Sequence, residues 1–278
     1  MFPKEWYEVP NTAPDATCPE KTNIYFLRTH QTGTSSIVNI FYRFGQMRGL
    51  NFVLYPLKMH LGYPAPMNVK YLEHIGSAEG YNIMTQHVRH NSLAAFRIMP
   101  EGTMFTTLLR NPVAQFLSVF HNHDIKSEIK YLQAKHDPID IFFEDPQKFA
   151  MSSSDRIYHL LQNSMAFDLG LDPKWHNDPD KVNTFIADLD KEFHFVLILE
   201  QLDESLVLLR RLMCWKLDDI LYVRLSVNNE YSRKVDPKIE AAILEWNKVD
   251  LQLYNHFADK MKKILAQQGP DFQREVTV

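Results

Sequence analysis

Glycine is scarce in this chain: 9 of its 278 residues, roughly half the usual frequency. No G-x-G-x-x-G occurs, so the dinucleotide-binding fingerprint of Rossmann folds is absent, and no G-x-x-x-x-G-K-[ST] occurs, so there is no standard Walker A loop. The same scarcity excludes collagen-like and glycine-rich disordered chains. With 45% apolar residues, the chain is long enough to bury a sizeable core.

Cysteine and long apolar runs are also rare. Cys18 and Cys214 are the only cysteines, which argues against a disulfide framework and a cysteine-based zinc site. The closest histidine pairs, at 87/90 and 121/123, lack a third ligand, so we expect no metal. No apolar run approaches the ~20 residues of a membrane span, and the polar first 20 residues do not resemble a signal peptide.

Neither acidic nor basic residues are in large excess in this chain. Thirty basic and 34 acidic residues give a net charge of −4, and no basic block suggests a nucleic-acid partner. No N-x-[ST] sequon occurs, so no N-glycan is expected. Together with the scarce cysteine, this composition favours a soluble, cytosolic protein.

Five short apolar segments predict β-strands, at 23–27, 51–55, 81–85, 104–109 and 195–199. Helical patterns alternate with them, which predicts an α/β fold with a mostly parallel sheet and helices on both faces. We expect one domain over residues 23–268, an irregular lead-in over 1–22 and a tail over 269–278.

Two helix boundaries are predicted from local signals. The helix after the first strand has apolar residues at helical spacing from Ile37 to Phe44, and Gly45 is a plausible stop. Asp236-Pro237 predicts the start of one long final helix, which Gly269-Pro270 ends.

The loop at 28–36 carries the strongest chemical signal. It joins a strand to a helix and contains several hydroxyl side chains and one glycine, Gly33. Backbone N–H groups at a helix N-terminus, with about half a positive charge from the helix dipole, favour a bound phosphate. The alternative is an ordinary capped strand-to-helix loop.

A second signal joins Arg110 and Ser118. Arg110 follows the strand at 104–109, at the edge where open α/β sheets bind ligands. Ser118 lies on the polar side of the next helix, so the two side chains could hold one phosphate from two sides. The alternative is a surface serine beside an arginine that flanks a helix.

Several segments together resemble the galactose 3-O-sulfotransferase family, the group of galactosylceramide sulfotransferase. The resemblance covers roughly residues 22–258, in the family's order. Its motifs are Phe26-Leu27-Arg28-Thr29-His30-Gln31-Thr32-Gly33-Thr34-Ser35-Ser36, Asn82 to Arg89, Leu108-Leu109-Arg110-Asn111-Pro112 with Ser118, Ala166 to Asp172, and Phe195 to Trp215.

This resemblance implies a three-layer fold similar to P-loop NTPases, and transfer of a sulfuryl group from 3′-phosphoadenosine-5′-phosphosulfate (PAPS), without a metal, to the 3-hydroxyl of galactose in a glycan or glycolipid. It assigns His87 as the base, with His30 as the rival, and Arg110 and Ser118 to the 3′-phosphate. The alternative for His87 is a structural histidine at a strand end. The residues assigned to the 5′-phosphosulfate are Arg28, Thr29, Gln31, Thr32, Gly33, Thr34, Ser35 and Ser36.

Gln31 departs from the family, which has lysine there in the pattern His-Lys-Thr. Gln31 donates a hydrogen bond but brings no charge, and loss of such a donor costs on the order of 10²–10³ in rate. Arg28, three residues earlier, is a possible substitute for the charge. A weakened enzyme or pseudoenzyme, a rewired site and an introduced substitution remain open.

The second departure concerns location and acceptor. The family is anchored in the Golgi membrane, which implies the Golgi lumen if this chain has been trimmed, and the cytoplasm if it is complete. A soluble member could act on a small alcohol, and a pseudoenzyme could bind PAPS or a glycan. For the acceptor site we expect Arg89, His90, Tyr158 and Trp175, although core packing or a salt bridge would also explain them.

Overall fold

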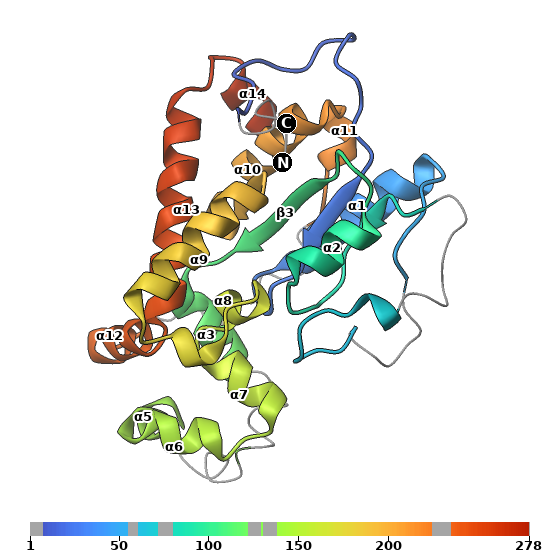
Figure 1. Ribbon diagram of the computed structural model, residues 1–278. Helices are drawn as coiled ribbons and strands as arrows, with labels where there is room; N and C mark the ends of the chain where they lie inside the picture. Colours follow the sequence, from blue (N-terminus) through green and yellow to red (C-terminus); the bar gives the residue numbers. More distant parts are fainter. Residues whose placement is uncertain are drawn as a thin grey trace.

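A parallel sheet forms the centre of the computed structural model, which describes residues 8–54, 61–71, 80–121, 129, 138–223 and 235–277 (Figure 1). Within these residues the sheet has four strands in the order β2-β1-β3-β4. Their bounds are β1 (Ile24–Leu27), β2 (Ile83–Met84), β3 (Met104–Leu109) and β4 (Phe195–Ile198). Every strand residue is buried, as expected for a parallel sheet covered on both faces. The predicted α/β class is confirmed.

The strand predicted at 51–55 is not a ladder strand. Phe52 forms only an isolated parallel bridge to Ile83, and Val53 donates its N–H to the Ile83 carbonyl at 2.8 Å. Asn51 also accepts from the N–H groups of Asn82 and Ile83, but β2 is only two residues long, so the pairing beside it stays short. Residue 55 lies outside the described residues.

Helices make up most of the rest of the chain. They are α1 (Thr34–Met47), α2 (Ser92–Ile98), α3 (Pro112–Phe120), α5 (Pro138–Glu144), α6 (Pro146–Met151), α7 (Asp155–Leu161), α8 (Ser164–Asp168), α9 (Pro179–Glu192), α10 (Leu202–Met213), α11 (Leu217–Ile220), α12 (Pro237–Trp246), α13 (Lys248–Ala266) and α14 (Phe272–Val276). Short 3-10 turns occur at Val69–Tyr71, Pro173–Trp175 and Leu199–Gln201. None of the helices in the described part of the chain is long and apolar enough to cross a membrane.

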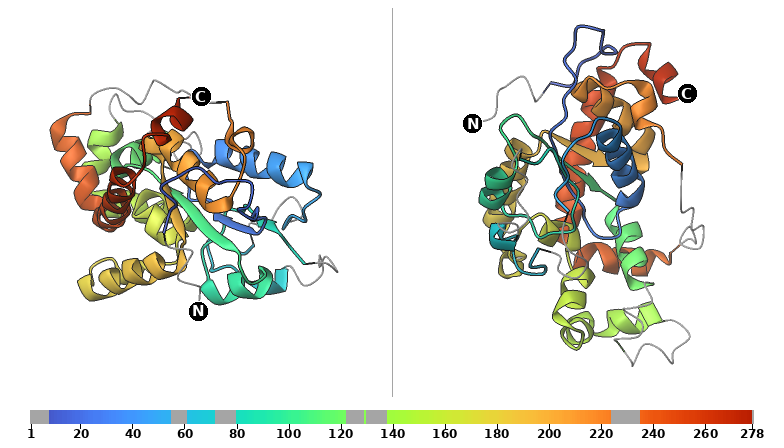
Figure 2. Two further views of the ribbon diagram at one scale, coloured as in Figure 1. Left: turned by 90° about the horizontal axis from the view of Figure 1, so that it is seen from above. Right: turned by 90° about the vertical axis from the view of Figure 1, so that its right-hand side faces the viewer.

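The helices form two layers, one on each face of the sheet (Figure 2). Neighbouring residues of β1 point to opposite layers, as the strand period of two requires. Phe26 meets Phe41 of α1 at a ring distance of 5.2 Å, whereas Tyr25 stacks on Phe105 at 4.7 Å. Phe105 in turn meets Phe96 of α2, so α1 and α2 cover opposite faces.

One predicted helix end and the predicted continuity of the final helix are wrong. Helix α1 continues through Gly45 to Met47, and a Cβ on Gly45 would lie 2.4 Å from Cζ of Phe52. Close packing therefore explains this glycine. The predicted final helix begins at Pro237 as expected but is broken at Asn247 into α12 and α13, and the Asn247 side chain accepts the N–H of Asn163 at 2.8 Å.

A second apolar core lies beside the sheet. Helix α3 contributes Phe116 and Phe120, and the other helices around it contribute Phe142, Leu161 and Ile243. The helices α5, α6 and α7 lie at the end of the molecule to which α3 runs (Figure 1).

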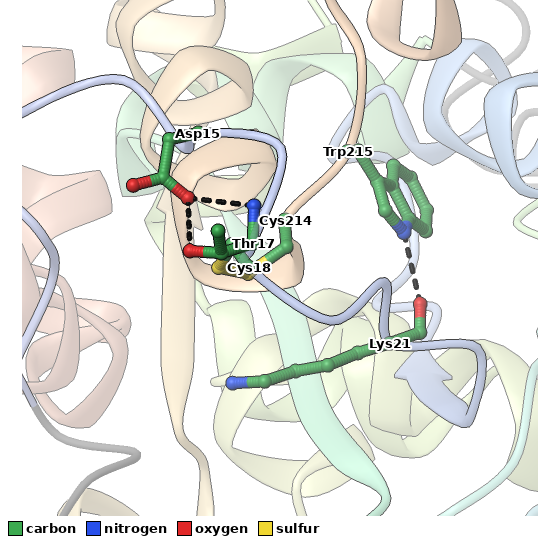
Figure 3. The surroundings of a disulfide bond; sticks show 6 residues. All are labelled: Asp15, Thr17, Cys18, Lys21, Cys214 and Trp215. Carbon is green, nitrogen blue, oxygen red and sulfur yellow. Dashed lines mark hydrogen bonds between the residues drawn. A yellow bond between two sulfur atoms is a disulfide. The ribbon is translucent and has the colours of Figure 1, made fainter.

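Cys18 and Cys214 form a disulfide across 196 residues, which corrects the expectation from scarce cysteine (Figure 3). Two hydrogen bonds to backbone carbonyls flank the disulfide. Lys21 N donates to the Met213 carbonyl at 3.0 Å, and the Trp215 indole donates to the Lys21 carbonyl at 2.9 Å. Composition counts cysteines but says nothing of their separation in space, so this pairing was not predictable from the sequence alone.

His194 gives a test of the packing beside β4. Its Nδ1 accepts the N–H of Phe105 at 2.9 Å, and burial lowers the pKa of His194 from 6.5 to about 4, with Lys21 adding to the effect. Because the folded-state pKa is the lower one, the unfolded chain takes up a proton first as the pH falls from about 6.5 to 4. The stability that neutral His194 contributes is complete above this window and is lost within it.

His194→Asn keeps an acceptor for Phe105 but cannot titrate. We expect the free energy of unfolding of this variant to fall less than that of the wild type between about pH 7 and pH 5. Urea denaturation at both pH values measures the difference. An equal fall in the two proteins would contradict the assignment.

Candidate functional site

The loop between β1 and α1 has an unusual backbone. Gln31 and Gly33 both take left-handed conformations, with φ of 58° and 81°. Two features favour glycine at position 33: its φ is positive, and a Cβ there would lie 3.1 Å from Cδ1 of Leu199. The loop thus turns sharply just before α1 begins.

Two buried threonines hold the loop in shape. The Thr29 and Thr32 hydroxyls lie 2.7 Å apart, and Thr29 donates to the Leu108 carbonyl of β3 at 2.6 Å. Both side chains are fully buried. Of the residues assigned to phosphosulfate, these two therefore support the loop with their hydroxyls.

The first turn of α1 is open to a ligand. Gly33 is the N-cap, no side chain caps the turn, and the turn contains no acidic residue. The N–H groups of Thr34, Ser35 and Ser36 therefore have no capping side chain, and Ser35 is exposed. This arrangement, at the end of a 14-residue helix, is what an anion needs.

Two arginines flank the loop. Arg28 Nε contacts the Thr34 hydroxyl at 3.5 Å, and Arg110 Nη1 donates to the Gln31 carbonyl at 2.9 Å. Burial lowers the pKa of Arg28 and of Arg110, and Glu200 opposes the shift at Arg110. A half-buried guanidinium without a bonded carboxylate is stabilised by an anionic ligand.

Arg110 and Ser118 both donate a hydrogen bond to Gln31. The Ser118 hydroxyl donates to Oε1 of Gln31 at 2.9 Å, while Arg110 holds the backbone of Gln31. The sequence placed Arg110 and Ser118 together, but it did not indicate that Gln31 joins them.

His87 and His30 lie face to face. Their rings stack with centroids 4.5 Å apart, and Nδ1 of His87 lies 3.0 Å from the Arg28 carbonyl. Because a carbonyl only accepts, Nδ1 carries the proton in this pair, and the lone pair of a neutral His87 ring lies on Nε2. This is the tautomer that a base acting through Nε2 requires.

Asp168 and Gln115 were not identified from the sequence. Oδ2 of Asp168 accepts from the backbone N–H of His30 at 2.8 Å and lies 2.9 Å from its Nδ1. Gln115 donates to the His30 carbonyl at 3.2 Å and to Ser164 at 2.6 Å. Asp168 does lie in the segment 166–172 that carried part of the resemblance, but no local pattern links it to His30.

A reciprocal cap fixes the position of α8, the helix that carries Asp168. Asp250 accepts from the N–H groups of Met165 and Ala166 at 3.1 and 2.8 Å, and Asn163 accepts from those of residues 249 and 250. Burial raises the pKa of Asp250 to about 7, while the two N–H groups oppose the shift.

His90 is a buried residue that connects the sheet to α9. It is 6% exposed, its Nδ1 lies 2.9 Å from the Tyr25 hydroxyl, and its Nε2 lies 2.8 Å from Glu192. Both ring nitrogens are therefore engaged between the sheet and α9, which leaves no nitrogen for an acceptor.

Arg89 lies closer to the site than the other residues expected to bind the acceptor. Its guanidinium lies over Phe167, 4.4 Å from the ring centre, and donates to the Leu171 carbonyl at 3.2 Å. Phe167 is the residue before Asp168, so Arg89 borders the His30–Asp168 pair.

Tyr158 and Trp175 pack elsewhere. Tyr158 packs against the second core, and Trp175 packs against the main core with Lys174 and Lys181 at 4.9 and 5.2 Å from its ring. None of the described contacts joins either ring to the loop at 28–36. In the described part of the chain, no cluster of three or more His, Cys, Asp or Glu forms a metal site.

An open helix N-terminus at the carboxyl end of β1, with Arg28 and Arg110 beside it, is an arrangement with which α/β proteins bind phosphorylated ligands. The family model for galactose-3-O-sulfotransferase matches residues 5–278, and the chain belongs to this family. The resemblance that the sequence motifs indicated is thereby confirmed.

Individual relatives are consistent with this family assignment. The chain is 36% identical over 256 residues to human galactose-3-O-sulfotransferase 2, covering 91% of this chain and 63% of that protein. It is 31% identical over 261 residues to mouse galactosylceramide sulfotransferase, covering 93% and 62%. The chain therefore spans about three fifths of the length of these relatives.

Proposed function

We propose that this protein is a PAPS-dependent sulfotransferase that transfers a sulfuryl group to a carbohydrate hydroxyl, the 3-hydroxyl of galactose in a glycan or glycolipid. The open first turn of α1 beyond Gly33 is the observation that carries the proposal. The names of the relatives support the choice of a galactose acceptor.

The residues present fit the donor. The N–H groups of Thr34, Ser35 and Ser36 would hold the 5′-phosphosulfate, and Arg28 lies beside them. Arg110 and Ser118 both donate to Gln31, beside which they would hold the 3′-phosphate. PAPS, when bound, supplies the sulfuryl group and a phosphate leaving group.

His87 would act as the base. Its Nε2 carries the lone pair in the neutral tautomer, so it would take the proton of the acceptor hydroxyl as the oxygen attacks sulfur in line. The stacked His30 ring restricts the orientation of His87. The backbone donors of α1 would stabilise the charge that develops on the leaving phosphate.

Titration with PAPS and with ATP, separately, tests the proposal. We expect PAPS to bind and ATP to bind much more weakly, because Arg110 and Ser118 select a 3′-phosphate. Isothermal calorimetry measures both. Binding of ATP but not PAPS would contradict every sulfotransferase assignment.

A PAPS-binding protein without turnover is the second candidate, and Gln31 is the observation that favours it. Gln31 has no charge, and its side-chain oxygen is taken by Ser118. Tight PAPS binding without transfer to any galactoside or simple alcohol would support this candidate.

Gln31→Lys is expected to raise the transfer rate, by up to about 10²-fold, because a lysine would add a charged donor near the leaving group. The Ser118 hydroxyl, now a donor to Gln31, can accept from the lysine instead. Initial rates at saturating PAPS measure the change. An unchanged or lower rate would contradict this expectation.

We also propose an oxidising compartment, the Golgi lumen, as the location. The Cys18–Cys214 disulfide supports this choice, because disulfides persist in secretory compartments and are rare in the cytosol. Thiol labelling of the protein from its native source tests it, and two free thiols would contradict it.

A further inference from the structure

The loop has no positively charged side chain at position 31, where the resemblance leads us to expect lysine. Gln31 is neutral, and both of its oxygens already accept hydrogen bonds, the side-chain oxygen from Ser118 and the carbonyl from Arg110. If the site transfers a sulfuryl group, another residue must stabilise the leaving phosphate.

His30, the preceding residue, is bound to a buried carboxylate. Asp168 is fully buried, and its Oδ2 accepts from the backbone N–H of His30 at 2.8 Å and contacts Nδ1 at 2.9 Å. The other oxygen, Oδ1, is buried and has no hydrogen-bond partner among the described residues. Every described hydrogen bond of this carboxylate therefore goes to His30.

A buried carboxylate with one oxygen unsatisfied is costly unless its partner carries positive charge. A protonated His30 ring would provide that charge through its Nδ1–H, in the same way that a buried aspartate stabilises the imidazolium of a catalytic triad. The second ring nitrogen, Nε2, then carries a proton it can donate. The His30 side chain is 15% exposed, and Nε2 has no hydrogen-bond partner among the described residues.

We propose that the His30–Asp168 pair supplies the positive charge that Gln31 lacks. This inference rests on the proposed function. As the acceptor oxygen forms its bond to sulfur, the bond from sulfur to the bridging oxygen breaks, and His87 takes the acceptor proton. The leaving 5′-phosphate keeps the electron pair and accepts a hydrogen bond from Nε2–H of His30. Asp168 acts through His30 and is a positioning residue.

Charged and titratable groups from several elements surround His30. Asp168 of α8 is bonded to it, His87 stacks on it at 4.5 Å, and the Tyr63 ring lies at 4.9 Å. Arg89 is within electrostatic range of Asp168, and Arg28 is bonded to His87 through its carbonyl. Asp168 is the one carboxylate that bonds the His30 ring in the described structure.

Asp168→Asn tests directly whether the charge of Asp168 is needed. The His30 backbone N–H can only donate, so the asparagine oxygen should replace Oδ2 and keep both contacts to His30. The variant therefore removes the charge and preserves the geometry. Asp168→Asn with Gln31→Lys then adds a cation at the neighbouring position.

The experiment measures the Kd values of PAPS and of its product, 3′-phosphoadenosine-5′-phosphate, by calorimetry, together with initial transfer rates. In Asp168→Asn we expect the product, whose 5′-phosphate carries the leaving charge, to lose roughly tenfold more affinity than PAPS. The rate should fall by about 10²-fold. Gln31→Lys should restore most of both losses in the double variant.

Asp250→Asn is the matched control. Asp250 is also fully buried, binds the backbone of α8 and lies within electrostatic range of Asp168, but it makes no described contact with His30, so its variant measures what a change in α8 alone does to the two Kd values. We expect this variant to keep the wild-type difference between the two Kd values.

Three results would overturn the inference: wild-type affinities and rate in Asp168→Asn, a loss that Gln31→Lys does not restore, or an equal loss in Asp250→Asn. A wild-type protein that does not bind PAPS would refute the proposed function and this inference with it. Wild-type binding with unaffected Asp168→Asn would refute this inference alone.

Discussion

Replacing His87 by alanine is expected to lower kcat by about 10²- to 10⁴-fold, with little change in the affinity for PAPS. A positioned general base contributes an effect of this size. The hydrogen bond from Nδ1 to the Arg28 carbonyl puts the lone pair of the neutral ring on Nε2, which is the atom that would take the proton. Transfer assays and calorimetry on the same protein separate the two quantities.

His256→Ala is a suitable control for the His87 variant. His256 lies on α13, its side chain is 39% exposed, and its partner is Asp190 at 3.4 Å. We expect this variant to keep both kcat and the PAPS affinity. If His87→Ala lost affinity as much as rate, His87 would be a residue of the donor site or of the fold, and His30 would become the first candidate for the base.

Removing the disulfide is expected to have the largest effect on stability. The Cys18–Cys214 bond closes a loop of 196 residues, and cross-links of long loops contribute about 2–5 kcal/mol by restricting the unfolded chain. For a chain of this size, the midpoint of thermal unfolding should fall by roughly 5–15 °C in Cys18→Ser/Cys214→Ser. Thermal denaturation with and without reductant measures the change.

The same variant should bind PAPS normally when folded. Cys18 precedes β1, and Cys214 follows α10, whereas the ligand loop leaves the carboxyl end of β1 (Figure 1). Reductant should lower the midpoint of the wild type and leave that of the double variant unchanged. Equal midpoints for the oxidised wild type and the variant would show that the bond does not contribute to stability.

The mechanism assigns a separate task to each stacked histidine. His87 is bonded to a neutral carbonyl and would accept a proton, whereas His30 is bonded to a buried carboxylate and would carry a charge. Because the two rings lie only 4.5 Å apart, their different partners, the Arg28 carbonyl for His87 and Asp168 for His30, would give one ring the role of base and the other the role of cation. Gln31 would then be compatible with an active enzyme.

Much of the fold was predictable because its signals are local. The segment at 104–109 combines apolar residues with two β-branched threonines and forms β3 as predicted, and the segment at 195–199 forms β4 over all but its last residue. Asn111 and Pro112 were predicted to begin a helix, and Asn111 indeed accepts from the N–H groups of residues 113 and 114. Gly45 misled because its role is packing against Phe52, which lies outside the local pattern.

The sequence by itself determined the local chemistry of this protein. The order of a strand, a hydroxyl-rich loop with Gly33 and an amphipathic helix predicts an anion site, because backbone donors and helix dipoles depend on near neighbours. The set of motifs along residues 22–258 was also sufficient to identify the family.

Only the tertiary structure decided which distant residues complete the site. Asp168 lies 138 residues from His30, and Cys214 lies 196 residues from Cys18. Neither pair follows from periodicity or composition, because each is created by the packing of elements that are remote along the chain. The buried carboxylate next to the loop at 28–36 and the covalent link near the N-terminus are therefore properties of the fold.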